Sequence, residues 1–176
     1  MTDQPQQARD ATIYQYKLVR KIPLRPEAKY SYLTTGAIGM IAISAIYGWI
    51  GLLYAVAGLL LMFAVHAVVL RITLRRVDET AERRWGIRFD LPWFGPLPVM
   101  DTLLSLFRRL HYHLLLVGCC FAGLCYPWSS SALLVSLIFW HIWLLAPRFN
   151  LLLRIRRESG EGVIRLASTE VSYYHR

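Results

Sequence analysis

Residues 30–70 read YSYLTTGAIGMIAISAIYGWIGLLYAVAGLLLMFAVHAVVL, and these 41 residues contain no Asp, Glu, Lys or Arg. A second uncharged stretch of 38 residues extends from 110 to 147. An ordinary soluble domain carries charged residues along every exposed face, and a disordered chain is much less hydrophobic than this one, which is 56% hydrophobic. The sequence therefore predicts a polytopic membrane protein.

Each uncharged stretch is long enough for two membrane-spanning helices, because a hydrocarbon core about 30 Å thick takes roughly 20 helical residues. Gly48 and Gly51 lie near the middle of the first stretch and Pro127 near the middle of the second, all beside aromatic residues that favour the membrane surface. We predict an all-α fold with four transmembrane helices in two hairpins, 31–49 with 52–70 and 110–127 with 131–147. A re-entrant hairpin is the alternative for either pair.

The charges predict how the chain is organised and oriented. The 20 Lys and Arg and the 11 Asp and Glu fall into three blocks, with balances of 6 − 3, 8 − 5 and 6 − 3, or +3 each. Positively charged segments remain in the cytoplasm, so we predict that both termini and the central loop are cytoplasmic in a plasma or inner membrane. The predicted segments are a basic tail at 1–29, a hairpin at 30–70, a loop with an interfacial helix at 71–109, a hairpin at 110–147 and a basic tail at 148–176.

The cytoplasmic segments are expected to contain short amphipathic helices. Asp101 is a suitable N-cap for an interfacial helix at 101–110. The last span is expected to continue as an amphipathic helix after Pro147. The residues that follow Gly162 are expected to form a loose tail, with docking on the sheet edge of a partner as the alternative.

The basic residues predict contact with anionic lipid headgroups or with a partner protein. Each basic residue near an anionic membrane surface contributes about 1 kcal/mol to binding. We expect these contacts at Arg20, Lys21, Arg75, Arg76, Arg108, Arg109, Arg156 and Arg157. Nucleic acid is not an expected partner, because these charges adjoin predicted spans on every side.

Histidines are the strongest candidates for chemistry within the spans, which contain no Asp, Glu, Lys or Arg. At about 1.5 Å per residue, His66, His113 and His141 lie roughly 6–11 Å from the cytoplasmic helix ends. We favour hydrogen bonding between helices as their role. The alternative is haem b or a metal held by imidazoles from two helices, so no cofactor or metal is assigned.

Small residues predict where helices pack closely. Gly39, Gly51, Gly58 and Gly118 each lie on a stripe of small residues, and such stripes allow helix backbones to approach each other in lipid. The three cysteines match no zinc or redox motif and are interpreted as small packing residues.

These features favour a non-catalytic accessory, assembly or scaffold component of a membrane complex. The expected partner is another membrane protein or a second copy of the chain, and no catalytic residue is predicted. One alternative is a small oligomeric transporter or channel. Another is a histidine-ligated haem or metal redox subunit, or a membrane enzyme.

Overall fold

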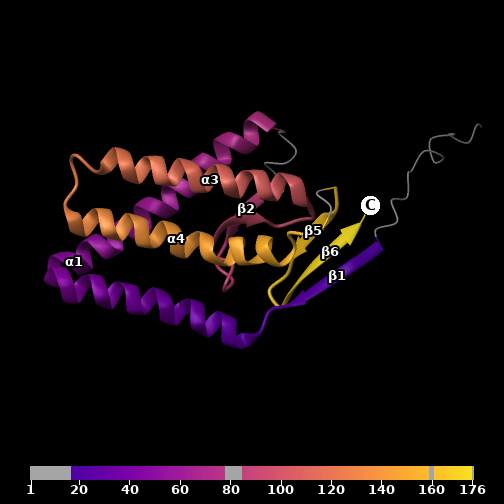
Figure 1. The fold of residues 1–176 in the computed structure, drawn as a ribbon, viewed down its shortest axis with the longest axis horizontal. Coiled ribbons are helices and arrows are strands. Elements are labelled where there is room, and N and C mark those ends of the chain that lie inside the picture. Colours follow the sequence, from indigo (N-terminus) through magenta and orange to yellow (C-terminus); the bar gives the residue numbers. More distant parts are fainter. Residues whose placement is uncertain (1–16, 78–84, 159–160, 176) are drawn as a thin grey trace, which may run out of the picture.

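The computed structural model describes residues 17–77, 85–158 and 161–175, which form three helices and six strands (Figure 1). The helices are α1 (Pro26–Val77), α3 (Leu104–Cys125) and α4 (Ser131–Arg154). The strands are β1 (Lys17–Pro23), β2 (Trp85–Arg88), β3 (Gly95–Pro98), β4 (Thr102–Leu103), β5 (Val163–Leu166) and β6 (Glu170–His175). The first 16 residues of the predicted N-terminal tail lie outside the described residues.

Helix α1 reverses direction at Gly48, which has a φ of 67° and a ψ of −155°. Residues other than glycine rarely adopt this backbone conformation. Figure 1 shows the first, indigo arm of α1 followed by a purple arm that passes behind α4. Both arms contact α4, since Gly36 on the first arm lies against Trp143 and Gly58 on the second lies against Ser136. Gly48 therefore lets the long uncharged stretch fold back on itself.

The helices are joined by hydrogen bonds that side chains of α4 donate to α1. Trp143 Nε1 donates to the carbonyl oxygen of Tyr32 at 3.0 Å, and Trp140 Nε1 donates to that of Ala55 at 2.7 Å. Such bonds stabilise helix contacts in apolar surroundings, where little water competes for the same groups. They attach α4 to both arms of α1.

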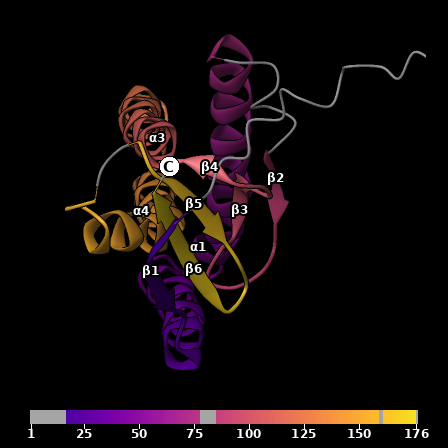
Figure 2. The same cartoon turned by 90° about the vertical axis from the view of Figure 1, so that its right-hand side faces the viewer.

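A four-stranded antiparallel sheet lies at one end of the helices, with the strand order β1-β6-β5-β4 (Figure 2). In its longest pairing, β1 lies beside β6 from Lys17 opposite His175 to Pro23 opposite Glu170. Strand β4 comes from the central loop, so the sheet joins all three charged segments of the chain. Strands β2 and β3 form a separate two-stranded sheet.

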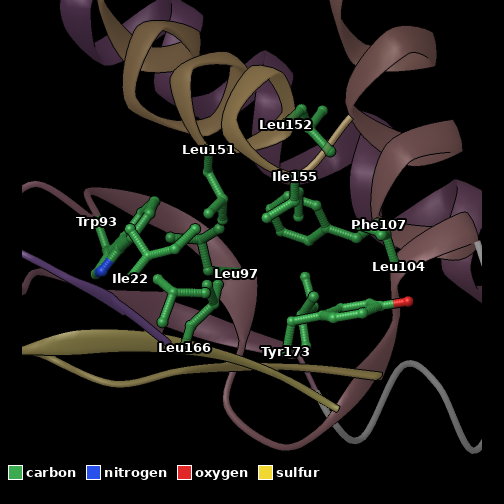
Figure 3. Close-up of a cluster of buried hydrophobic side chains, with 12 residues drawn as sticks. Ile22, Trp93, Leu97, Leu104, Phe107, Leu151, Leu152, Ile155, Leu166 and Tyr173 are labelled. Carbon is green, nitrogen blue, oxygen red and sulfur yellow. The ribbon is translucent and has the colours of Figure 1, made fainter. Parts of the chain in front are cut away.

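A compact apolar core attaches the four-stranded sheet to the helix ends (Figure 3). Ile164 and Tyr173 contribute from the sheet, Phe107 from α3 and Ile155 from the residue after α4. Trp93, from the loop before β3, lies in the same core. Burial of these side chains supplies the free energy that holds the sheet against the helices.

The prediction of an all-α fold with four transmembrane helices is wrong. The described chain has three helices and two antiparallel sheets, and the strands come from the three charged segments. Among the described residues, α1 and α4 are the two helices long and apolar enough to cross a membrane. Strand pairing between the tails joins residues that are distant in sequence, and local periodicity cannot reveal it.

The predicted interfacial helix at 101–110 is also wrong. Residues 102 and 103 form β4, and α3 begins at Leu104 and continues to Cys125 as one helix. Asp101 is not its N-cap, because that position belongs to Leu103. Asp101 instead accepts hydrogen bonds from Arg165 Nε at 2.6 Å and Nη2 at 2.7 Å. The C-terminal residues, expected to be loose, form β5 and β6 in the chain's own sheet.

Candidate functional site

Arg148 lies on α4 and is 1% exposed. Its Nη2 donates a hydrogen bond to the carbonyl oxygen of Phe94 at 2.8 Å. Its Nε and Nη1 are buried and have no hydrogen-bond partner among the described residues. Arg148 was expected at the surface, on an amphipathic continuation of the last span. The helix does continue past Pro147, but it carries this guanidinium into the interior.

The loop before β3 holds the guanidinium in place. Gly95 has a φ of 110°, a conformation that favours glycine, and a Cβ atom added there would lie 2.7 Å from Arg148 Nη2. The ring of Phe94 packs beside Phe63 of α1, with 5.5 Å between the centroids. The loop is therefore shaped around Arg148 and also contacts the second arm of α1.

His66 and His141 form a hydrogen-bonded pair between α1 and α4, with 2.9 Å between His66 Nε2 and His141 Nδ1. His141 Nε2 lies 3.1 Å from the carbonyl oxygen of Leu115. A carbonyl can only accept, so Nε2 of a neutral His141 carries the proton and its Nδ1 accepts from His66. Nδ1 of His66 is then a bare acceptor, buried without a hydrogen-bond partner in the described structure.

His111 and Tyr32 present two further polar atoms without partners. His111 is fully buried on α3, and its Nδ1 lies 2.7 Å from the carbonyl oxygen of Phe107. That carbonyl requires the proton on Nδ1, which leaves Nε2 of a neutral His111 as an acceptor. Within the described residues, neither this Nε2 nor the Tyr32 hydroxyl has a hydrogen-bond partner.

These side chains form one group, here called the Arg148 cluster, which consists of Tyr32, His66, His111, His141 and Arg148. Arg148 interacts electrostatically with Tyr32, His66 and His111, and His66 is bonded to His141. A buried cation that lacks an anionic partner costs several kcal/mol. The cluster combines guanidinium donors with imidazole acceptors. Its unpaired atoms could therefore hydrogen-bond with a guest that both donates and accepts, such as water.

The structure brings together two of the three histidines proposed as haem or metal ligands. His113 is exposed on α3, where it lines a shallow depression with Arg109 and Tyr112. In the part of the chain that the structure describes, no group of three or more His, Cys, Asp or Glu could hold a metal ion. His111 was expected at the membrane boundary and was not among the proposed ligands, although it shares the buried face of α3 with Phe107, Leu114 and Gly118.

The four predicted packing glycines lie at close contacts. Added Cβ atoms would collide with Phe139 at Gly39, with Ser136 at Gly58 and with the His141 ring at Gly118, so these three lie between helices. Gly51 instead contacts Ile43 and Tyr47 of α1 itself, beside the reversal. Gly118 matters most to the site, because its missing side chain provides the space for His141.

The predicted basic contact residues are spread over the sheet end of the molecule. Arg20 pairs with Glu158 at 3.2 Å and Lys21 with Glu170 at 2.7 Å, and the hydrogen bond to Glu170 raises the pKa of Lys21. Both therefore also join the N-terminal and C-terminal segments. The exposed members of the remaining set are Arg75, Arg76, Arg109, Arg156 and Arg157, and Arg108 is half-buried.

No protein-family model, curated protein or solved structure matches this chain. The features of the chain itself that bear on its function are the apolar helix surfaces, the charged sheet and the Arg148 cluster.

Proposed function

We propose that the protein is a multi-pass integral membrane protein that serves as an accessory or assembly component of a membrane complex. The observation that carries this proposal is the exposed apolar surface of α1 and α4. Within an apolar segment of 18 residues in each helix, only 22% is buried in α1 and 44% in α4. A helix in the core of a soluble protein is mostly buried, and soluble monomers rarely expose large apolar patches. Lipid tails covering these helices would account for the exposure.

The distribution of aromatic and basic residues supports an orientation with both tails in the cytoplasm. Trp49, Tyr126 and Trp128 are exposed at the helix ends opposite the sheet, as in the aromatic belts of membrane proteins (Figure 1). The exposed arginines gather at the sheet end, and basic segments favour the cytoplasmic side. Under this proposal the four-stranded sheet is cytoplasmic.

An apolar patch around the two-stranded sheet supports the accessory role. Ile87, Phe89, Val99 and Met100 are all exposed, and we call them the β2–β3 patch. The nearby Phe94 packs against α1, so a membrane protein alongside the second arm of α1 could cover this patch as well. The free edge of β1 is less suited to docking, because a bulge near Val19 and flanking basic residues disfavour strand addition.

Membrane insertion and orientation can be tested directly. The protein should remain in the membrane pellet after alkaline carbonate extraction. A reporter fused after Arg176 should be active only in the cytoplasm. Release by carbonate, or labelling of the C-terminus by an impermeant reagent outside the cell, would contradict the proposal.

The accessory role is tested by affinity capture in mild detergent with wild-type protein and a Phe89→Ser/Met100→Ser variant. We expect one membrane protein to co-purify in a fixed ratio with the wild type and to be lost with the variant. Val19→Ser, an exposed apolar change on the other sheet, is the matched control and should retain the partner. Isolation of the wild type alone in every detergent that preserves its fold would argue against this role.

The Arg148 cluster favours a second candidate, a small oligomeric transporter or channel for an oxyanion. The predicted spans had no charged residue to form a path, whereas Arg148 supplies a buried cation among the helices. Phosphate should raise the melting temperature of the wild type in detergent at constant ionic strength, and Arg148→Gln should abolish the increase. Arg76→Gln is the control. Failure of proteoliposomes to take up phosphate above the empty-vesicle rate would eliminate this candidate.

A further inference from the structure

A groove of about 910 Å³ lies between the first arm of α1 and α4, next to the link between β1 and α1. Trp93, from the loop before β3, closes part of it. A space of this size is within the range of small-molecule sites in proteins. It is separate from the β2–β3 patch, and it shares only Tyr32 with the Arg148 cluster.

The lining of the groove divides into an apolar part and a polar part. Tyr32, Phe139 and Trp143 contribute aromatic surface, and the Tyr32 and Trp143 rings are stacked with their centroids 4.0 Å apart. Arg25, Asn150 and Arg154 lie where the first arm of α1 begins and α4 ends. A ligand that fills the groove must therefore be amphipathic.

The length of the groove matches one leaflet of a bilayer. Phe139 and Asn150 are 11 residues apart on α4, or roughly 16 Å at about 1.5 Å per residue. Half of a hydrocarbon core is about 15 Å thick. If the sheet is cytoplasmic, the aromatic part lies at the depth of acyl chains and the polar part at the depth of headgroups.

The charge of the polar part favours an anion. Arg25 and Arg154 contribute two positive charges and Glu27 one negative charge, which leaves the groove with a net charge of +1. Arg154 Nε donates a hydrogen bond to Asn150 Oδ1 at 3.0 Å, and this bond orients the guanidinium. Basic pockets between membrane helices on the cytoplasmic side suit phosphate-containing headgroups.

We propose that this groove binds one anionic phospholipid of the cytoplasmic leaflet. Its phosphate contacts Arg25 and Arg154, and an acyl chain lies along Tyr32, Phe139 and Trp143. The inference rests on the proposed membrane location. It also assigns one specific lipid phosphate to Arg25 and Arg154, which the sequence alone does not bring together.

The test uses full-length protein in phosphatidylcholine vesicles that contain a few mole per cent of a lipid with brominated acyl chains, which quench nearby tryptophans. Trp93 and Trp143 line the groove. They report its occupancy when the exposed Trp49 and Trp128, which any surrounding brominated lipid would quench, are replaced by Phe in every protein compared. We expect brominated phosphatidylglycerol to quench the wild type at concentrations roughly tenfold lower than brominated phosphatidylcholine. Arg25→Gln/Arg154→Gln should remove this preference. Lys17→Gln/Lys29→Gln removes the same charge at two residues that do not line the groove, and this control should keep the preference.

The outcomes distinguish a failure of the proposed lipid site from a failure of the proposed membrane location. Equal quenching by the two lipids, or equal loss of preference in both double variants, would overturn the lipid site and leave membrane insertion intact. Absence of quenching by either lipid, together with release by carbonate, would overturn the membrane location itself. Native mass spectrometry provides a second measurement, in which the wild type should retain one phosphatidylglycerol that Arg25→Gln/Arg154→Gln loses.

Discussion

The helices and the four-stranded sheet place their polar and apolar side chains in opposite ways. On the helices, Ile46 and Trp49 are largely exposed whereas His66, His141 and Arg148 are buried. The sheet buries Ile164, Val171 and Tyr173. Its charged residues form exposed ion pairs such as Arg165 with Asp101. The sheet is arranged as in a protein surrounded by water, and the helices as in one surrounded by lipid.

The comparison indicates that burial has different energetic consequences in the two regions. Moving an apolar side chain from water into the core of the sheet is favourable in itself. A side chain between two membrane helices leaves lipid that is as apolar as the protein interior, so only packing and hydrogen bonding favour the contact. Under the proposed membrane location, this difference accounts for the glycines and the indole hydrogen bonds to backbone carbonyls between α1 and α4.

The largest expected effect comes from truncating a fully buried side chain in each region. Ile164→Ala in β5 should lower the opening free energy of the sheet by about 2–5 kcal/mol, because both transfer and packing are lost. Leu137→Ala in α4 should lower that of the helices by roughly 1–2 kcal/mol, because only packing is lost. Hydrogen exchange of β5 and α4 amides measures the two values separately. Equal losses of opening free energy in the two variants would contradict the difference in surroundings between the sheet and the helices.

A glycine substitution within α3 sharpens the comparison for the helices. Gly118→Ala places a methyl group against the His141 ring and should destabilise the protein by about 1–3 kcal/mol. It should also weaken the bond between His66 and His141. Gly123→Ala is the matched control on the same helix, since an added Cβ there meets no atom within 4 Å, and it should leave stability unchanged or slightly higher. Detergent titration monitored by tryptophan fluorescence checks both, and equal losses would contradict close packing at Gly118.

The smallest expected effect concerns an ion pair on the sheet. Asp101 and Arg165 form two hydrogen bonds, which raise the pKa of the arginine, but both side chains are partly exposed. Asp101→Asn should therefore cost only about 0.2–1 kcal/mol, and less at high salt. A double-mutant cycle with Arg165→Gln isolates the pair energy. A coupling that does not change with salt would indicate that the pair is shielded from water.

Local patterns predicted much of the helical region. Two glycines among aromatics predicted a turn near Gly48, and α1 reverses at that residue. The site was harder to predict. The depths of His66 and His141 placed them near each other, but depth alone could not distinguish the exposed His113 from the buried His111 on α3. The regular spacing of buried residues along that helix would have separated the two.

The remaining features depend on contacts between distant segments. Strands β1 and β6 have 7 and 6 residues, which is an ordinary strand length. Their sequences do not show that they pair, because the partner of β1 lies at the other end of the chain. Arg148 shows the same dependence. Its charge and its position at the end of an apolar stretch are typical of a surface residue. Only in the folded chain do Phe94 and Gly95 cover its guanidinium.

The sequence by itself determined where the long apolar helices lie, where the first one reverses, and which segments carry the charge. These features follow from composition and from glycine's backbone freedom, which act over a few neighbouring residues. Only the tertiary structure decided that the three charged segments form one sheet, that Arg148 is buried, and that α1 and α4 enclose a groove. These features require residues as far apart in sequence as Lys17 and His175 to meet, and that encounter depends on the packing of the whole chain.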